Sequence, residues 1–178
     1  MKKIVLFLIA SLLTVTAHAG PRLTDVHPGF PCEGIEQVEN RLGSVEVAVP
    51  DANGISQYRG TEGGTEVTVV YHCEHGWLAE QEIIFKSDTR SEIYRIADAQ
   101  RKELVKRLGE PIHDGLNLGA WNKMMFGFLG ADLDYLTSVV VWGREKADVM
   151  LLVRKIEENH WEVIITQGSS KTEYILNS

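Results

Sequence analysis

The chain has 178 residues, of which 44% are hydrophobic and 24% charged, with five prolines, two cysteines and a formal net charge of −7. This composition excludes a disordered chain, a collagen-like repeat and a cysteine-rich miniature scaffold, because it supplies enough apolar material for one ordinary hydrophobic core. We therefore expect a globular protein.

Residues 1–19 have the pattern of a signal peptide. A basic start with two lysines and a short apolar run precede Ala17-His18-Ala19, which has the small-x-small form that signal peptidase cuts. We expect cleavage after Ala19, leaving residues 20–178 as a single exported α+β domain in the periplasm. The apolar run is too short to span a bilayer, and no later segment approaches the roughly 18 apolar residues that a span needs, so we expect no membrane insertion.

The two cysteines, Cys32 and Cys73, allow one intramolecular pairing. Because an exported protein meets an oxidising compartment, one disulfide is the simplest interpretation, with free thiols or metal ligands as the alternatives. The bridge would remove about 4 kcal/mol of unfolded-chain freedom in the loop-entropy model.

The acidic charge restricts the classes of partner. Loss of the two signal-peptide lysines would make the exported domain more acidic than the whole chain. Negative charge repels phosphate backbones and anionic lipids, so we expect no nucleic-acid partner, and it favours a basic protein partner. The alternative interpretation is that the acidity only maintains solubility. We expect no cofactor.

Apolar periodicity and turn residues predict the first half of the chain. An irregular start over residues 20–30 precedes a helix over 31–42 and four strands at 45–49, 55–59, 65–73 and 77–85. A capping-box pattern, Thr89-x-x-Glu92, then predicts the start of the longest helix, Arg90 to Leu108. Its buried face would contain Ile93, Ile96, Ala97, Leu104 and Leu108.

Three further strands are predicted at residues 137–142, 148–156 and 160–167, with a short strand near 174–176. The expected fold class is α+β, an antiparallel sheet with helices packed on one face.

Two short matches suggest an internal duplication. Residues 40–43 resemble 106–109 at two helix ends, and the hairpin at 66–77 resembles that at 148–161. The matches predict two helix-plus-three-strand repeats, and the alternative is a plain α+β domain. Such a duplication is similar in architecture to small exported inhibitors of the β-lactamase inhibitor protein type. This likeness is one of fold and assigns no residue.

Motifs for metal binding and catalysis are weak. His72 and His75 flank Cys73 and Glu74, a set that could bind zinc, but the disulfide would consume Cys73 and no second ligand pair has zinc-site spacing. We therefore predict no metal site and keep the two histidines as weak candidates. No nucleophile elbow, phosphate loop or His-Glu-x-x-His helix is present, so an enzyme is not favoured.

The segment from Leu116 to Leu136 is unusually apolar and contains glycines at 119, 127 and 130. Because each glycine weakens a helix by about 1 kcal/mol relative to alanine, we expect an adaptable insertion rather than a rigid element. The candidate residues for binding a partner or ligand are Trp121, Met124, Met125, Phe126 and Phe128. The alternative is that the insertion packs across the sheet and completes the core.

The favoured function is a periplasmic, non-enzymatic protein-binding module, such as an inhibitor or immunity protein against a basic toxin or cell-wall hydrolase. The second hypothesis is a periplasmic protein that binds a small apolar ligand, and the third is a hydrolase of unrecognised type. A closed cavity lined by Trp121 and Phe126 would favour a ligand, whereas an exposed patch rimmed by acids would favour a protein partner.

Overall fold

The computed structural model describes residues 21–48, 54–130, 132–143 and 148–168. The predicted signal peptide and the predicted strand near 174–176 lie outside the described residues.

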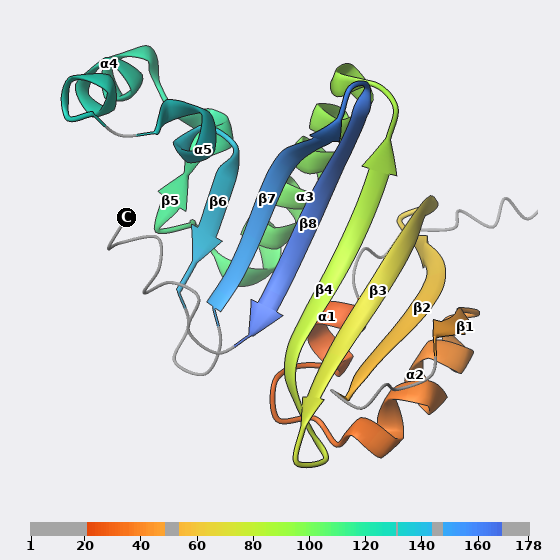
Figure 1. The fold of residues 1–178 in the computed structure, drawn as a ribbon. Helices are drawn as coiled ribbons and strands as arrows, with labels where there is room; N and C mark the ends of the chain where they lie inside the picture. The colour runs from red at the N-terminus through yellow and green to blue at the C-terminus, as the bar shows by residue number, and fades with distance from the viewer. Residues whose placement is uncertain (1–20, 49–53, 131, 144–147, 169–178) are drawn as a thin grey trace, which may run out of the picture.

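An eight-stranded antiparallel sheet forms the centre of the protein (Figure 1). The strand order across the sheet is β1-β2-β3-β4-β8-β7-β6-β5, and β4 and β8 are the two central strands. The strands are β1 (Val45–Ala48), β2 (Ile55–Glu62), β3 (Thr65–Glu74), β4 (Trp77–Ser87), β5 (His113–Asp114), β6 (Val139–Trp142), β7 (Asp148–Glu157) and β8 (His160–Gly168).

Tight turns between the longest strands explain why these segments pair with their neighbours. The β2–β3 turn contains Gly63 and Gly64, both with positive φ, and the β3–β4 turn contains His75 with φ 53° and Gly76 with φ 84°. The β7–β8 turn places Asn159 at φ 66°. Glycine and asparagine tolerate this left-handed conformation, so local turn chemistry makes the antiparallel hairpins.

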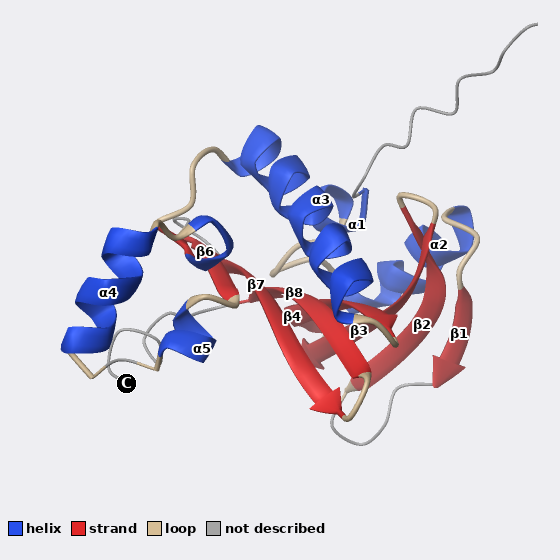
Figure 2. Ribbon diagram, turned by 90° about the horizontal axis from the view of Figure 1, so that it is seen from above, coloured by secondary structure: helices blue, strands red, loops and turns tan. Residues whose placement is uncertain are grey.

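Three helices cover one face of the sheet, namely α1 (Pro21–Asp25), α2 (Ile35–Arg41) and α3 (Arg90–Leu108) (Figure 2). A short 3-10 turn, η1 (Cys32–Gly34), leads into α2. The hydrophobic core lies between these helices and the sheet, where Ile35, Ile93, Val69, Phe85 and Ile165 are all buried. The predicted α+β fold with an antiparallel sheet is confirmed.

The predicted bounds of α3 are correct, but its predicted cap is wrong. Thr89 occupies the N-cap position without a side-chain hydrogen bond to the helix. Glu92 is instead held by Arg95, whose Nε and Nη2 donate to the carboxylate at 2.9 and 2.6 Å. An arginine three residues further along the same exposed face outcompetes the backbone N–H for this carboxylate.

The expectation of an irregular start over residues 20–30 is wrong for residues 21–25, which form α1. Proline suits the first position of a helix, since its missing N–H would have no partner there, and Pro21 occupies that position. Burial of Arg22 and Val26 then ties this short segment to the core.

The second half of the chain contributes η2 (Gly115–Asn117), α4 (Ala120–Phe128) and α5 (Leu133–Leu136) near the β5 and β6 edge. In element order, α2 precedes β1 to β4 and α3 precedes β5 to β8, and the two halves meet where β4 pairs with β8. This order is compatible with the proposed duplication, which stays a prediction.

Candidate functional site

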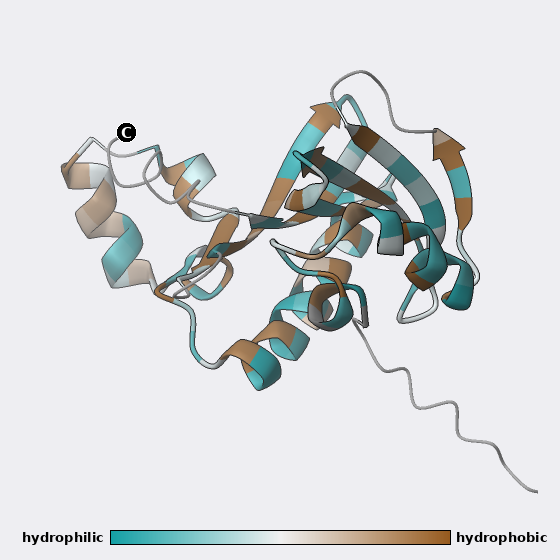
Figure 3. Ribbon diagram, turned by 90° about the horizontal axis from the view of Figure 1, so that it is seen from below, coloured by the Kyte–Doolittle hydropathy of each residue, from teal (hydrophilic) through white to brown (hydrophobic). Residues whose placement is uncertain are grey.

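Helix α4 exposes an apolar stripe to solvent. Trp121, Met124, Met125 and Phe128 follow the i, i+3, i+4, i+7 spacing that places side chains on one helix face. Their exposed fractions are 68%, 46%, 43% and 82%, and Leu129, directly after the helix, is 77% exposed. We call these five side chains the α4 stripe. Figure 3 shows α4 at one end of the molecule with a largely hydrophobic colouring.

The opposite face of α4 attaches the helix to the rest of the protein. Phe126 is half-buried, and a Cβ built on Gly127 would lie 3.4 Å from the Cδ1 atom of Leu133 in α5. Since Phe126 and Gly127 supply the inward face, the α4 stripe points away from the protein. The candidate residues are therefore divided, with Phe126 half-buried and the other four exposed.

Residues 120–128 of the segment form a helix in spite of the glycine content, and the adaptability of the insertion stays a prediction. Gly119 is the N-cap residue, Gly130 follows the helix with φ 73°, and only Gly127 lies within α4. Glycines outside a helix carry no helix penalty, and one with positive φ after the last turn is a normal helix stop. The sequence pattern did not show which glycines lie inside the helix and which end it.

Polar and steric contacts fix the base from which α4 extends. The Nε atom of Arg101 in α3 donates to both carboxylate oxygens of Asp114 at 2.9 Å, and the same carboxylate accepts from the Asn117 N–H at 3.2 Å. This hydrogen-bonded carboxylate raises the pKa of Arg101. Gly115 lies so close to α5 that an added Cβ would be 1.9 Å from the Leu136 carbonyl oxygen. These contacts hold β5, η2 and α5 together, and α4 lies between η2 and α5 in the chain.

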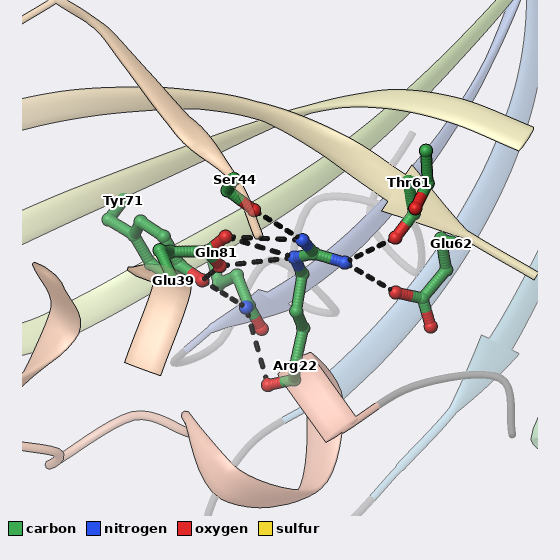
Figure 4. A network of polar contacts seen from close by, with 7 residues as sticks. All are labelled: Arg22, Glu39, Ser44, Thr61, Glu62, Tyr71 and Gln81. Carbon is green, nitrogen blue, oxygen red and sulfur yellow. Dashed lines mark hydrogen bonds and ion pairs between the residues drawn. The ribbon is translucent and has the colours of Figure 1, made fainter. Parts of the chain in front are cut away.

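A buried ionic network lies at the other end of the sheet (Figure 4). Its residues come from α1, α2, β2, β3, β4 and the α2–β1 loop: Arg22, Glu39, Ser44, Thr61, Glu62, Tyr71 and Gln81. The Arg22 side chain is 1% exposed and pairs with Glu39 at 3.0 Å and with Glu62 at 2.7 Å. It also donates to Ser44 Oγ at 2.7 Å and to the Thr61 carbonyl at 2.9 Å.

Burial and the two carboxylates set the ionisation of this network. Burial opposes the charged form of Arg22, but the hydrogen bonds and charges of Glu39 and Glu62 outweigh it and raise the pKa of Arg22. The Tyr71 hydroxyl donates to Glu39, and burial together with that carboxylate raises the pKa of Tyr71. The arginine stays charged and the phenol stays neutral, so the network is an architectural link among these elements rather than a reactive pair.

Sequence reasoning missed this network, although part of the signal is visible. Ile35, Val38, Glu39 and Leu42 share one face of α2, so a glutamate lies within the apolar stripe. A carboxylate in such a place needs a buried partner, but the spacing does not identify Arg22, which lies 17 residues away in an unrecognised helix.

The predicted disulfide between Cys32 and Cys73 is confirmed, with a Cα–Cα distance of 6.3 Å. It joins the start of the α2 region to the end of β3. His72 is half-buried and His75 is exposed in the β3–β4 turn. Within the described ranges, no three His, Cys, Asp or Glu side chains gather in a way that could hold a metal ion.

A small depression lies between α3 and the sheet, beside Glu62, Gln100 and Arg107. It is remote from α4 and contains none of the candidate binding residues. Among the described helices, none is long and apolar enough to cross a membrane.

Comparison with known proteins gives no family for this chain: no family model, no curated protein and no solved structure matches it.

Proposed function

We propose that this protein is an exported, non-enzymatic protein-binding module that contacts other proteins through the α4 stripe. The observation that carries the proposal is the exposure of Trp121, Phe128 and Leu129 at 68%, 82% and 77% on α4 and the residue directly after it. Trp, Phe and Met are enriched at protein interfaces, and the combined apolar patch is at the upper end of what monomeric proteins expose.

The distribution of charge supports a basic partner. Residues 21–88 contain 12 Asp and Glu against 4 Lys and Arg. One of those four, Arg22, is buried between Glu39 and Glu62 and adds no positive charge to the surface. An acidic surface steers basic proteins toward it at low ionic strength.

Acidic residues of α2 and β1 raise the pKa of a nearby tyrosine. Glu36 and Glu46 are both exposed, and after burial their charges are the largest causes that raise the pKa of Tyr58 to about 12. We propose the α2–β1 end as the acidic surface for a basic partner, with a basic toxin or a cell-wall hydrolase as the partner classes. The protein would then act as an inhibitor or an immunity protein.

The apolar-ligand hypothesis has less support, because it requires Trp121 to line an enclosed cavity and this side chain is exposed. The segment from Leu116 to Leu136 presents an outward stripe rather than an inward lining. An exposed stripe favours a protein partner over an enclosed small molecule.

Site-specific photo-crosslinking in the producing cells tests the proposal. A photoreactive residue at position 121 should give a protein adduct, whereas the same residue at position 156 should give none. Ile156 is a matched control because it is also an exposed apolar side chain, 48% accessible, and lies near the end of β7, outside both the α4 stripe and the α2–β1 end. Absence of any protein adduct at position 121, or equal yields at both positions, would exclude the α4 stripe as a protein contact.

The acidic surface has its own test. The double charge reversal Glu36→Lys and Glu46→Lys should abolish the salt-sensitive retention of basic proteins on the immobilised protein. The matched control is Glu157→Lys with Glu158→Lys, two exposed acids at the β7–β8 turn. Equal loss of retention in both variants would show that net charge alone, rather than the α2–β1 end, attracts the partner.

A further inference from the structure

We propose that the α4 stripe is a self-association surface through which two copies of this chain form a symmetric dimer. The inference rests on the proposed function in one respect, since it takes the stripe as a protein contact. It goes further by naming the occupant of the stripe as a second copy of the same chain. The acidic α2–β1 end then stays available for a basic partner.

The stripe is complementary to itself. Its aromatic residues, Trp121 and Phe128, lie at the two ends, and its two methionines lie between them. When two such helices pack antiparallel about a two-fold axis, Trp121 of one copy lies opposite Phe128 of the other, and Met124 lies opposite Met125. Each large ring then meets another ring, and the flexible methionines fill the centre.

The charge distribution permits self-association at α4 and opposes it elsewhere. The whole chain carries −7, so two copies repel each other. From Gly115 to Gly130 the chain contains no acid and a single charged residue, Lys123, which the helical spacing places off the stripe. Figures 1 and 2 place α4 at one end of the molecule and α2 and β1 at the other. Contact through α4 therefore keeps the acidic ends of the two copies far apart.

The exposed area suits a weak, reversible dimer. An aromatic side chain presents about 150–250 Å², so Trp121 and Phe128 together expose roughly 300 Å² at their exposed fractions of 68% and 82%. With Met124, Met125 and Leu129 the stripe reaches roughly 600 Å² per copy, so the dimer would bury at most about 1,200 Å² through these side chains, the lower limit for a specific interface. Interfaces of this size are typical of weak, transient complexes, so we expect a reversible dimer.

Sedimentation equilibrium of the protein purified from cells that express the full chain measures this constant. We expect a monomer–dimer equilibrium with a dissociation constant of about 1–100 µM. Because a symmetric interface contains each substitution twice, Trp121→Ala or Phe128→Ser should weaken the dimer by at least about 100-fold. Trp77→Ala, the matched control, should leave the constant unchanged. The free energy of unfolding should be the same in all of these variants, since the replaced side chains are exposed.

Charge pairs test the register at the centre of the interface. The variants Met124→Lys and Met125→Glu should each be monomeric alone, and an equimolar mixture should form a heterodimer, because the axis places these two positions opposite each other. Moderate salt should weaken the heterodimer and should not weaken the wild-type dimer, which buries apolar surface and separates like charges.

Four results would overturn the inference. A monomer at all concentrations up to about 1 mM would do so, because this limit lies at least about tenfold above the expected dissociation constant. A dimer that Trp121→Ala and Phe128→Ser leave intact would place the contact elsewhere. If position 121 crosslinks to a different protein and never to a second copy, the proposed function stands and the self-association is refuted. If position 121 gives no adduct at all, both the proposed function and the self-association are refuted.

Discussion

Replacing Arg22 with alanine is expected to destabilise the protein by about 4 kcal/mol, because it would remove the cation that pairs with the buried carboxylates of Glu39 and Glu62. Arg22 is 1% exposed, and the carboxylates of Glu39 and Glu62 are 0% and 4% exposed. Removing one partner of a buried ion pair costs about 3–5 kcal/mol, since the remaining charge cannot regain the solvation it has in the unfolded chain. Ser44 and the Thr61 carbonyl would each lose a hydrogen bond as well.

Urea unfolding followed by circular dichroism measures this loss. With an m-value of about 2 kcal/mol/M, the urea midpoint should fall by about 2 M. The underlying loss of about 4 kcal/mol is a large part of the free energy of unfolding of a protein of this size. In a double-mutant cycle, adding Glu39→Gln to Arg22→Ala should recover part of the loss, because a neutral amide is cheaper to bury than an unpaired carboxylate.

The matched control is Arg59→Ala. Arg59 also pairs with a glutamate, Glu66, at 3.6 Å, but the two side chains are 61% and 75% exposed. An exposed pair of this kind contributes less than about 1 kcal/mol. If Arg22→Ala costs no more than Arg59→Ala, the buried network does not hold α1 and α2 to the sheet.

Three further predictions concern other parts of the fold. The double variant Cys32→Ala and Cys73→Ala should have a free energy of unfolding about 4 kcal/mol lower than the wild type, because the bridge spans 41 residues of sequence. Urea unfolding of the reduced wild type should show the same loss. Gly115→Ala should cost about 3 kcal/mol through the clash with the Leu136 carbonyl, whereas Gly119→Ala, where an added Cβ meets nothing within 4 Å, should be close to neutral in the same assay. The free energy of unfolding should fall as the pH rises from 10 to about 12. Burial, Glu46 and Glu36 raise the pKa of Tyr58 to about 12, so the unfolded chain loses this proton at a lower pH than the folded protein. In the Tyr58→Phe variant the free energy of unfolding should depend less on pH in that range.

Local patterns predicted the elements whose structure depends on near neighbours in the sequence. The predicted bounds of α3, Arg90 to Leu108, agree with the structure because its apolar spacing, its preceding turn and Gly109 all act within a few residues. The β3–β4 and β7–β8 hairpins were predicted for the same reason. The Cys32–Cys73 bridge followed from the number of cysteines and from the expected compartment, without any knowledge of geometry.

Features that depend on distant contacts were missed. The short helix α1 depends on burial of Arg22 among Glu39 and Glu62, which lie 17 and 40 residues away in sequence. Glu39 lies within the apolar face of α2, but this position in the sequence does not by itself predict that the carboxylate is buried and paired. For α4, four of the five candidate residues are exposed, and their role in binding stays a prediction; spacing could not show that Gly127 would face α5 and turn the stripe outward.

At two places in this protein the distribution of polarity is the reverse of what folding alone favours. Three charged side chains, Arg22, Glu39 and Glu62, are buried at one end, where they satisfy one another. At the other end, the apolar side chains of the α4 stripe are in contact with water. Burying side chains such as Trp121 and Phe128 would be worth about 1.5–3 kcal/mol each, and the monomer gains none of this where they are exposed. Because the side chains of the α4 stripe are exposed, polar replacements along the stripe should change the free energy of unfolding little. The free energy available from the α4 stripe is therefore released only when another protein surface covers it.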